Sequence, residues 1–581
     1  MAPSQWPLDN GSISSPALRC GSKNVASCLR RVQRSAVLFA VRVSKRPRLL
    51  RLLGLLVALG LGVAFWYHKY FNIKPVFRSD MDSTMTTIPH FNADQIHTRW
   101  TDESFECIGW HETDTCEPEN TYPRRELAKM RSCSEMVERR KAGYCEVRNR
   151  TSGAILRLMV TSCRSIVNRD FTCDMARDFS EFSLLAKHYQ HSPMATSLTL
   201  PTAQQHPPTN AILMIVYDKV LPSAYAAIRV LRDHGCEIPI EMWYRPDEMS
   251  ADVPLIHELT RDYNVHMREI FDKRAVGFHT KPHAVYYSAY DNILLLDADN
   301  IPVRDPSYLF EDPTFLRDGA VFWPDYWQPA NSLFDVHSHS LVWQLLGMDF
   351  WDQFEQESGQ VLINRRKAKD ALNKLMYYST HEPHLIDKLS LVWGDKDLFR
   401  LAWRNTSTPY HMIERPPAIG GIYSYAKRVF CGLAMVQYDP TGNIVFFHRN
   451  SVKLDGSANQ PHTITHIQQY RSSRPASEYR VGQIIAELDQ ESCYHIRSNK
   501  TMDGELPTFI TPIEYTPYAA IEPAAIKYSI VGRKLHEAGM AHLHFGESLV
   551  YLCVIGAVIL VYWQYMKRAQ GKHLPARWKS Y

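Results

Sequence analysis

Asn292-Ile-Leu-Leu-Leu-Asp-Ala-Asp-Asn300 is the stretch from which the fold can be worked out. Residues 292–296 form a run dominated by leucine and isoleucine, which is typical of a strand buried on both faces of a sheet. The run ends directly at Asp297 and Asp299. Open sheets of parallel strands collect their ligands at the carboxyl ends of the strands. The stretch therefore predicts a buried strand that presents two carboxylates to a ligand.

The same kind of segment recurs on both sides of this strand. Helical stretches are expected at 222–233, which opens with a proline, and at 282–289. Apolar strands that alternate with helices predict an α/β domain with a mostly parallel sheet covered on both faces. Further strands are expected at residues 211–217, 238–244, 319–323, 359–363 and 444–447.

Asp-x-Asp occurs three times, at Asp80/Asp82, Asp297/Asp299 and Asp395/Asp397. Only the second pair stands where a buried strand ends and a loop begins. Two carboxylates there can hold a hard cation and leave ligand positions open for phosphate oxygens. The cation would neutralise the charge that grows on a departing nucleoside diphosphate. The alternative is a pair of turn aspartates before Pro302.

Charge is concentrated at the two ends of the chain. Residues 1–51 contain ten Lys or Arg and one Asp, and residues 567–581 contain five Lys or Arg and no acid. The residues between them carry more acidic than basic side chains, although the whole chain has a net charge of +5. A nucleic-acid-binding protein needs its positive charge on the folded domain, so this class is excluded.

Both basic tails adjoin an uncharged apolar run, 52–67 and 548–566, each of a length that suits a thin bilayer. A cleaved signal peptide fits the first run poorly, because bulky residues 65–68 follow it. Positive charge stays on the cytosolic side, so both termini are expected in the cytosol and the middle in the lumen of the Golgi or the ER.

Six cysteines crowd into one segment, and in an oxidising lumen they predict three disulfides with fifteen possible pairings. A zinc module is the alternative, but no two of them have Cys-x-x-Cys spacing. Three more, at positions 236, 431 and 493, leave at least one free or intermolecular. Glycosylation sequons begin at Asn149, Asn405 and Asn499. The six clustered cysteines are Cys107, Cys116, Cys133, Cys145, Cys163 and Cys173.

Composition and hydropathy together divide the chain into nine parts. The expected parts are a cytosolic tail (1–51), a membrane anchor (52–67), a stem (68–105), a cysteine-rich module (106–182), a linker (183–209), a catalytic domain (210–452), a lumenal extension (453–547), a second membrane helix (548–566) and a cytosolic tail (567–581).

Residues 294–310, which contain Leu-Leu-Leu-Asp-Ala-Asp-Asn-Ile-Pro, closely resemble the α-mannosyltransferases of glycosyltransferase family 71, the fungal Golgi α-1,2- and α-1,3-mannosyltransferases. The resemblance covers roughly residues 210–452, and not the cysteine-rich module or the second membrane helix. Further segments similar to the family follow in the same order: Phe278-His-Thr-Lys-Pro282, Gln356-Glu-Ser-Gly-Gln-Val-Leu-Ile363, Trp393-Gly-Asp-Lys-Asp-Leu-Phe399 and Phe446-Phe-His-Arg-Asn450.

The resemblance implies a GT-A-like nucleotide-diphospho-sugar transferase fold and an α-mannosyltransferase that retains the anomeric configuration. It implies GDP-mannose as donor, a glycan or glycoprotein as acceptor, and Mn²⁺ or another divalent cation as cofactor. Asp297 and Asp299 would hold the metal, and Asp297 would also meet the nucleotide-sugar. The residues alone do not separate guanine from uracil, so a UDP-sugar donor stays open.

Two basic side chains are further candidates for this site. His448 follows an apolar strand and either completes the metal shell, which would favour manganese over magnesium, or is a core histidine. Lys281 stands before a proline at a helix start and either pairs with a donor phosphate or lies in solvent.

The segment Trp393-Gly394-Asp395-Lys396-Asp397 is a candidate for recognition of the donor sugar, with carboxylates for its hydroxyls and an aromatic for stacking; the alternative is a helix cap at Asp395. Glu357 could orient the acceptor hydroxyl or, in an inverting enzyme, act as base. Four aromatics form either a sugar-stacking platform or ordinary core: Trp323, Tyr326, Trp327 and Trp343.

Two other classes of protein remain to be weighed. A noncatalytic membrane glycan-binding protein would not need its Asp-x-Asp pair intact. A metal hydrolase would need a richer cluster of His and Asp for two metals, which the sequence does not show.

Overall fold

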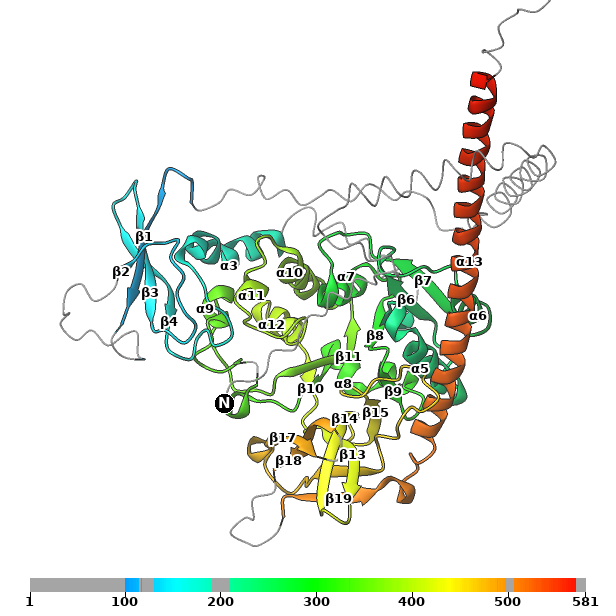
Figure 1. The fold of residues 1–581 in the computed structure, drawn as a ribbon. Helices are drawn as coiled ribbons and strands as arrows, with labels where there is room; N and C mark the ends of the chain where they lie inside the picture. The colour runs from blue at the N-terminus through cyan, green and yellow to red at the C-terminus, as the bar shows by residue number, and fades with distance from the viewer. Residues whose placement is uncertain are drawn as a thin grey trace, which may run out of the picture. The chain divides into compact units, whose positions relative to one another are not determined.

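The computed structural model describes residues 100–113, 116, 130–190, 209–333, 335–487, 490–497 and 506–570 (Figure 1). The chain forms two compact units, Thr87–Gly539 and a second unit made of Met1–Thr86 and Met540–Tyr581. The predicted tail 1–51, anchor 52–67 and most of the stem lie outside the described residues.

The cysteine-rich segment folds as a small antiparallel sheet with the strand order β2-β1-β3-β4. The strands are β1 (Phe105–Glu112), β2 (Met130–Arg131), β3 (Gly143–Asn149) and β4 (Ile155–Thr161), followed by η2 (Cys173–Met175) and α3 (Ala176–Gln190). All six clustered cysteines are paired, and the structure selects one of the fifteen pairings. The disulfides are Cys107–Cys133, Cys116–Cys163 and Cys145–Cys173.

Helix α3 joins this sheet to the rest of the unit, so the first part of the predicted linker, residues 183–190, is helical instead. The Phe182 ring lies 5.1 Å from the ring of Tyr377 on α10 (Lys369–Thr380). A single apolar core contains Trp110 of β1, Phe182 and Leu295 of β8. The cysteine-rich segment is therefore packed on the α/β domain and is not a separate globule.

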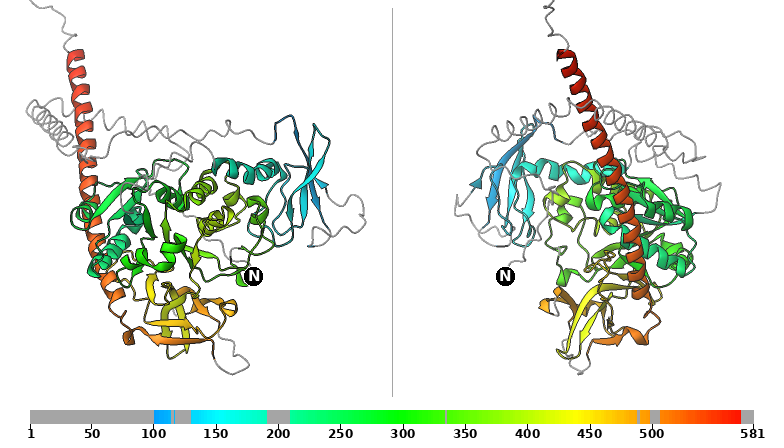
Figure 2. Two further views of the ribbon diagram at one scale, coloured as in Figure 1. Left: turned by 180° about the vertical axis from the view of Figure 1, so that it is seen from behind. Right: turned by 45° about the vertical axis from the view of Figure 1, so that its right-hand side comes forward.

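The central sheet, whose strands are drawn in shades of green in Figure 2, has the order β12-β10-β11-β8-β5-β6-β7. Its strands are β5 (Asn210–Ile215), β6 (Ile240–Tyr244), β7 (Val265–Glu269), β8 (Asn292–Leu296), β10 (Ala320–Pro324), β11 (Gln356–Asn364) and β12 (His411–Met412). Strands β7, β6, β5 and β8 run parallel, whereas β11 is antiparallel to β8 and β10. The fold is therefore mixed α/β, and the predicted strands lie within a few residues of those observed.

Helices connect these strands, as the alternation in the sequence predicts. They are η3 (Asp218–Val220), α5 (Leu221–Asp233), α6 (Pro254–Asp262), η4 (Gly277–His279), α7 (Thr280–Tyr287), η5 (Ser307–Glu311), α8 (Pro313–Asp318), η6 (Pro329–Asn331), α9 (Val342–Leu346), α10, α11 (Leu385–Lys388) and α12 (Leu398–Asn405). Pro222 stands in the first turn of α5, where its missing N–H costs nothing.

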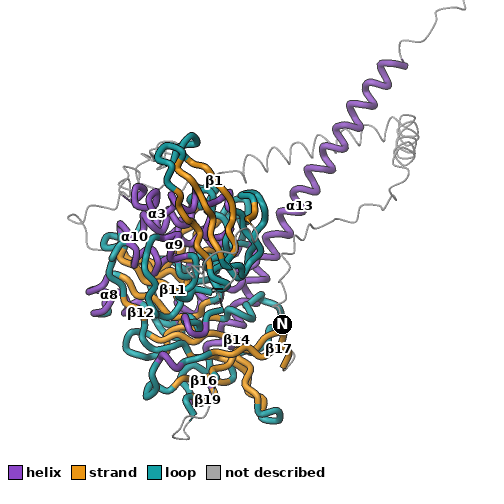
Figure 3. The backbone as a smooth tube through the Cα atoms, turned by 90° about the vertical axis from the view of Figure 1, so that its left-hand side faces the viewer, coloured by secondary structure: helices purple, strands orange, loops and turns teal. Residues whose placement is uncertain are grey.

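A second sheet contains the strands drawn in yellow to orange in Figure 1, and Figure 3 shows it in orange. It has the order β17-β18-β14-β13-β16-β19, and the short strands β9 and β15 join it beside β14. The strands are β9 (Asn300–Pro302), β13 (Ala418–Ser424), β14 (Val429–Tyr438), β15 (Ile444–His448), β16 (His466–Tyr470), β17 (Val481–Glu487), β18 (Gln490–Ile496) and β19 (Thr508–Pro512).

This sheet corrects two expectations. Residues 444–447 were assigned to the parallel sheet, but β15 pairs antiparallel with β14 and β9 instead. The predicted boundary at residue 452 cuts through the sheet, because β16 pairs with β13, and Cys431 on β14 is bonded to Cys493 on β18. Cys236 is the free and buried cysteine among the described residues.

Residues 548–566 lie on the long helix α13 (Ile521–Gln570), which follows η7 (Ala476–Glu478) and η8 (Ile513–Tyr515) in the chain. Within the part of the chain that the structure describes, we find no helix with the length and apolar character needed to cross a membrane. The membrane topology stays a prediction.

Candidate active site

The turn after β8 fixes the two carboxylates. The Asp297 backbone N–H donates to the carbonyl of Gly359 (2.9 Å), and the Asp297 carbonyl accepts from the N–H of Asn300 (2.9 Å). The Asp299 carbonyl accepts from the N–H of Arg449 (3.0 Å). The carboxylates are thus placed by backbone bonds to β11 and to the end of β15.

His448 reaches this turn through strand pairing. In the register of β9 with β15, His448 lies opposite Asn300. Its Nε2 is 3.3 Å from Oδ1 of Asp299. The ligand atoms of Asp297, Asp299 and His448 lie within 4.8 Å of one another. Two carboxylates and one imidazole at these separations can hold a divalent cation.

A glycine in β11 makes room for the His448 ring. A Cβ on Gly359 would stand 2.5 Å from Cε1 and 2.7 Å from Nδ1 of His448, so any side chain here would displace the ring. The N–H of Gly359 also donates to Oε1 of Glu357 (2.7 Å), which places that carboxylate 3.9 Å from His448 Nδ1. Glu357 is therefore next to the group of three, and its role toward the acceptor stays a prediction.

Lys281 lies in the first turn of α7 and points to the same group. Its Nζ is 2.8 Å from Oδ1 of Asp297, 3.2 Å from the Ser358 carbonyl and 3.6 Å from Oδ2 of Asp395. Burial lowers the pKa of Lys281, but the Asp297 and Asp395 carboxylates outweigh it, so the pKa is raised and the ammonium persists. The alternative of a solvated Lys281 does not hold.

Lys453 also belongs to the site, although no motif or pattern in the sequence predicts it. Its ammonium donates a hydrogen bond to Oδ2 of Asp299. Burial raises the pKa of Asp299, but His448 and Lys453 lower it by more, so the pKa is well below its ordinary value. Asp299 is therefore ionised and faces two cationic groups, which is the environment that a bound metal cation would also satisfy.

Tyr217 is a second such residue, two positions after the end of β5. Burial raises the pKa of its hydroxyl, Lys453 opposes this, and Asp299 and Asp297 add to it. Its side chain thus lies at the same edge of the sheet as the two carboxylates, and it is partly exposed. A position close to the end of an apolar strand is the one sequence signal that could have found it.

Phe278 and Trp393 are large aromatics exposed next to this site, with 55% and 58% of their surface accessible. They belong to two segments far apart in the sequence that meet here. Gly394 adopts a φ of +60°, and a Cβ on it would stand 2.5 Å from the Phe278 ring. The glycine therefore serves both the left-handed turn and the close contact.

The two aspartates after Gly394 have different surroundings. Asp395 is buried beside Lys281, and burial raises the pKa of its carboxyl. Asp397 is fully buried; its Oδ1 accepts hydrogen bonds from the Gln356 N–H (2.8 Å) and from Arg400 Nε. Asp395 therefore stays a candidate for sugar recognition, whereas Asp397 holds α12 against β11.

Lys396, between them, is bound to two buried carboxylates. Its Nζ is 2.7 Å from Asp325 and 2.6 Å from Glu355. Burial raises the pKa of Asp325 to about 6 although Lys396 lowers it. These contacts fasten the Gly394–Asp397 turn to the ends of β10 and β11.

The aromatics that follow the Asp-x-Asp loop are core residues. Trp323 is fully buried and its indole N–H donates to the Tyr438 carbonyl (2.7 Å). Tyr326, Trp327 and Trp343 are buried too, so the predicted stacking platform is not present. Trp393, in contrast, is exposed.

Two of the sequons fall in the described residues. Asn149 ends β3, and its side-chain oxygen accepts from the N–H of Thr151 (2.9 Å). Asn405 ends α12 and donates to the Leu346 carbonyl (2.9 Å). Asn499 lies outside the described residues.

Residues 210–345 and 348–439 match a family model described as "Mannosyltransferase putative". Alpha-1,2-mannosyltransferase MNN24 of Candida albicans is 26% identical over 253 residues, which are 37% of this chain and 35% of that protein. Alpha-1,2-mannosyltransferase MNN2 of Saccharomyces cerevisiae is 21% identical over 266 residues, 37% of this chain and 43% of that protein. The chain thus spans less than half the length of these relatives.

A solved structure, galactosyltransferase LgtC in complex with donor and acceptor sugar analogues, aligns with 36% of this chain and 73% of its own at 13% identity and a TM-score of 0.25. The family model and the relatives agree on the class that the α/β domain is similar to, which is the glycosyltransferases. Within that class, the resemblance of this chain to the fungal α-1,2-mannosyltransferases is confirmed over residues 210–439.

Proposed function

We propose that this protein is a metal-dependent, retaining α-mannosyltransferase that moves mannose from GDP-mannose to a glycan hydroxyl. The observation that carries the proposal is the convergence of Asp297, Asp299 and His448 at the carboxyl edge of the central sheet, with Lys281 and Lys453 around them. The relatives named α-1,2-mannosyltransferases support mannose as the sugar. The alternating strands and helices support a GT-A-like fold.

The three side chains fit a divalent cation because their neighbours hold them in place. Lys281 and Lys453 hold the carboxylates of Asp297 and Asp299, and the Asp299 carboxylate holds the His448 imidazole. Asp297, Asp299 and His448 would hold Mn²⁺. Once bound, the metal neutralises charge on the leaving diphosphate. Lys453 would have to release Asp299 when the cation enters. Lys281 would keep Asp297 in place and bring its positive charge close to a donor phosphate.

The sugar would lie between the two flanking segments. Asp395 is positioned to accept hydrogen bonds from sugar hydroxyls, and Trp393 is exposed for stacking. Glu357, beside His448, would orient the acceptor hydroxyl. In a retaining transfer the leaving phosphate oxygen takes the acceptor proton as the bond from C1 to the acceptor oxygen forms, so these residues need not supply a base.

The direct test is a donor screen of the purified full-length chain in detergent with Mn²⁺, in which transfer and donor hydrolysis are scored separately. We expect GDP-mannose to be consumed, an α-linked product by NMR, and no turnover in EDTA. Turnover of a UDP-sugar instead would refute the donor. Glycan binding without consumption of any donor would refute the reaction and support a noncatalytic glycan-binding protein.

We further propose that the catalytic domain faces the lumen of the Golgi or the ER and that both termini are cytosolic. The four disulfides of the described residues support an oxidising compartment. Protease added to intact microsomes should remove both basic tails and spare the middle of the chain. A protected C-terminal tail would contradict this topology.

A further inference from the structure

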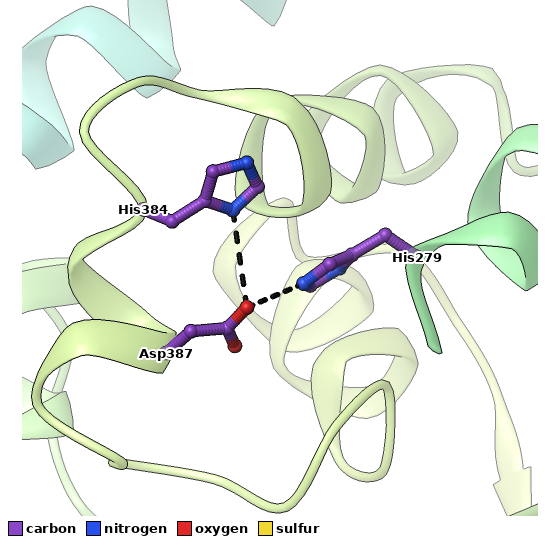
Figure 4. Close-up of side chains that lie close together, drawn as sticks. All are labelled: His279, His384 and Asp387. Atoms are coloured by element: carbon purple, nitrogen blue, oxygen red, sulfur yellow. Dashed lines mark hydrogen bonds and ion pairs between the residues drawn. The ribbon is translucent and has the colours of Figure 1, made fainter. Parts of the chain in front are cut away.

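A second cluster of ligand-type side chains lies outside the Asp-x-Asp site. His279, His384 and Asp387 have ligand atoms that all fall within 4.8 Å of one another. Figure 4 shows both imidazole rings turned toward the same carboxylate oxygen of Asp387. His279 Nε2 is 2.6 Å from that oxygen, and His384 Nδ1 is 4.0 Å from it. The mechanism proposed above uses none of the three.

The local structure brings them together from two places in the sequence. His279 ends η4 and stands just before α7. His384 precedes the first residue of α11, and Asp387 lies three positions further on, so the two share one side of that turn. The spacing His-x-x-Asp is therefore a sequence signal that becomes meaningful only when a second imidazole faces it.

We propose that His279, His384 and Asp387 form a binding site for a transition-metal ion, Zn²⁺ by its donor set, separate from the Asp297–Asp299–His448 group. Two imidazoles and one carboxylate suit zinc better than magnesium or calcium, which prefer oxygen ligands alone. Zinc sites with three protein ligands leave a fourth position for water. The proposal does not depend on the transferase reaction.

The distances suit such an ion after small side-chain rotations. Ligands about 2.1 Å from a tetrahedral zinc stand about 3.4 Å from one another. The distances from Asp387 Oδ2 to His279 Nε2 and to His384 Nδ1, 2.6 and 4.0 Å, lie on either side of this value. One ligand must move outward and the other inward by less than an ångström or so.

The surroundings of His384 support the assignment independently. Its other ring nitrogen, Nε2, is 3.4 Å from Oε1 of Glu382. Histidines that ligate metals commonly give their second ring N–H to a carboxylate, which fixes the tautomer and orients the ring. Glu382 would therefore position His384 with Nδ1 directed at the ion.

The three side chains differ in exposure, and the most exposed of them, Asp387, marks the side from which an ion could enter. The side chains of His279, His384 and Asp387 are 7%, 18% and 42% exposed. His279 Nδ1 has no hydrogen-bond partner among the described residues, and the Nε2 of the same ring contacts Asp387. An ion would enter past Asp387 and bind deepest at His279.

A bound ion there would also fix the start of α7. Lys281, two residues after His279, carries the contact to Asp297. Zinc would thus tie α11 to the helix start that supports the Asp-x-Asp loop, and the cluster would stabilise the fold around that loop rather than take part in the transfer.

The test measures zinc on the full-length chain in detergent, stripped with chelator and dialysed against low-micromolar Zn²⁺. We expect His384→Gln and Asp387→Asn each to hold one zinc ion fewer per chain than the wild type. The rise in Tm that Zn²⁺ causes in the wild type should be absent from both variants. His257→Gln is the matched control, because His257 pairs with Asp252 at 3.0 Å without a second imidazole; it should keep both properties.

Equal zinc content in the wild type and in both variants would overturn the proposal, and so would a loss of the same zinc in His257→Gln. Because a variant can fail to fold, the wild type is also titrated with Co²⁺. The intense visible absorption of a tetrahedral cobalt site should appear and should vanish on addition of Zn²⁺. Its absence would leave only a His279–Asp387 ion pair and refute the site.

Discussion

Asp299 contacts two cationic side chains, His448 and Lys453. We therefore expect activity to be most sensitive to substitution at this residue. Asp299→Asn and Asp297→Asn should each lower transfer by about a hundredfold or more, since several kcal/mol of charge stabilisation disappear with the metal. Asp80→Asn, in an Asp-x-Asp pair without a strand before it, should leave activity unchanged. The measurements are transfer rate and Mn²⁺ affinity. Full activity in the double variant or in chelator would contradict the proposed mechanism.

Asn is the better substitution here than Ala. Asp299 is 3% exposed and faces His448 and Lys453. A carboxylate in this position contributes to stability, whereas a loop aspartate in solvent would not. We therefore expect Asp299→Ala to lower Tm as well as activity, which would confuse the two effects.

The two aspartates of the Gly394–Asp397 turn should respond differently. Asp395→Asn removes the charge beside Lys281 and should lower transfer by about tenfold to a hundredfold with a small change in Tm. Asp397→Asn leaves the buried Arg400 without its carboxylate and should destabilise the fold by about 3 kcal/mol or more. Thermal unfolding and kcat measured on both variants test this difference. A loss of activity without a loss of stability in Asp397→Asn would mean that Asp397 binds the sugar.

Acid should destabilise the protein through His283. Burial among aromatic rings lowers its pKa from 6.5 to about 4. Since the unfolded chain takes up the proton first, the stability from this residue is complete above pH 6.5 and is lost as the pH falls toward 4. Replacement by an apolar ring, His283→Phe, should remove about 2 kcal/mol of the loss between pH 7 and pH 5.

Denaturant unfolding at the two pH values measures this difference. The ring of His283 lies 4.5 Å from that of Phe271 and 4.7 Å from that of Tyr287, so an aromatic substitute has partners. An unchanged pH dependence in His283→Phe would show that other buried groups dominate. His257→Phe, at an exposed position, serves as the control.

At the scale of elements, the close contact between Gly359 on β11 and His448 at the end of β15 determines the position of one of the three proposed metal ligands. Gly359→Ala would bring a Cβ to 2.5 Å from the His448 ring. The ring must turn away, and Mn²⁺ affinity should fall by at least about tenfold. Gly420→Ala on β13 meets Ile464 at 3.1 Å, far from the ligands, and should leave the affinity intact. Calorimetric titration with Mn²⁺ compares the two; equal affinities would remove His448 from the shell.

The sequence predicted those elements whose signal is local. Strand β8 was predicted residue for residue, because a strand covered on both faces is apolar throughout. The pairing of β9 with β15 could not be predicted, since β9 has three residues and its partner is set by tertiary packing. For the same reason nothing marked Lys453, and nothing separated Asp395 from Asp397, which have the same residue type in the same segment.

At the scale of the whole molecule, the boundaries inferred from composition are too narrow. Buried Arg449, after β15, forms an ion pair with Glu522 at the start of α13, and the same carboxylate accepts hydrogen bonds from Thr463 and Ile464. The cysteine-rich sheet shares its core with the central sheet. The part of the chain that folds as one is therefore close to residues 87–539.

This defines a prediction on fragments. A fragment of residues 87–539 should be soluble, unfold cooperatively and retain Mn²⁺-dependent transfer. A fragment of residues 210–452 lacks Lys453, the strands β16 to β19 and Glu522, and should aggregate or unfold without cooperativity. Size-exclusion chromatography and thermal unfolding distinguish them. A stable fragment of residues 210–452 would show that the catalytic domain ends at residue 452, as expected from the sequence.

The contact between Asp299 and Lys453 joins residues 154 positions apart in the chain. During synthesis the first of them leaves the ribosome long before the second. The Asp-x-Asp loop therefore has neither its lysine nor the nearby imidazole until the later strands arrive, and closing so long a loop is slow relative to local pairing. The proposed cation site therefore cannot be completed until the chain has been made beyond His448 and β15 has paired with β9.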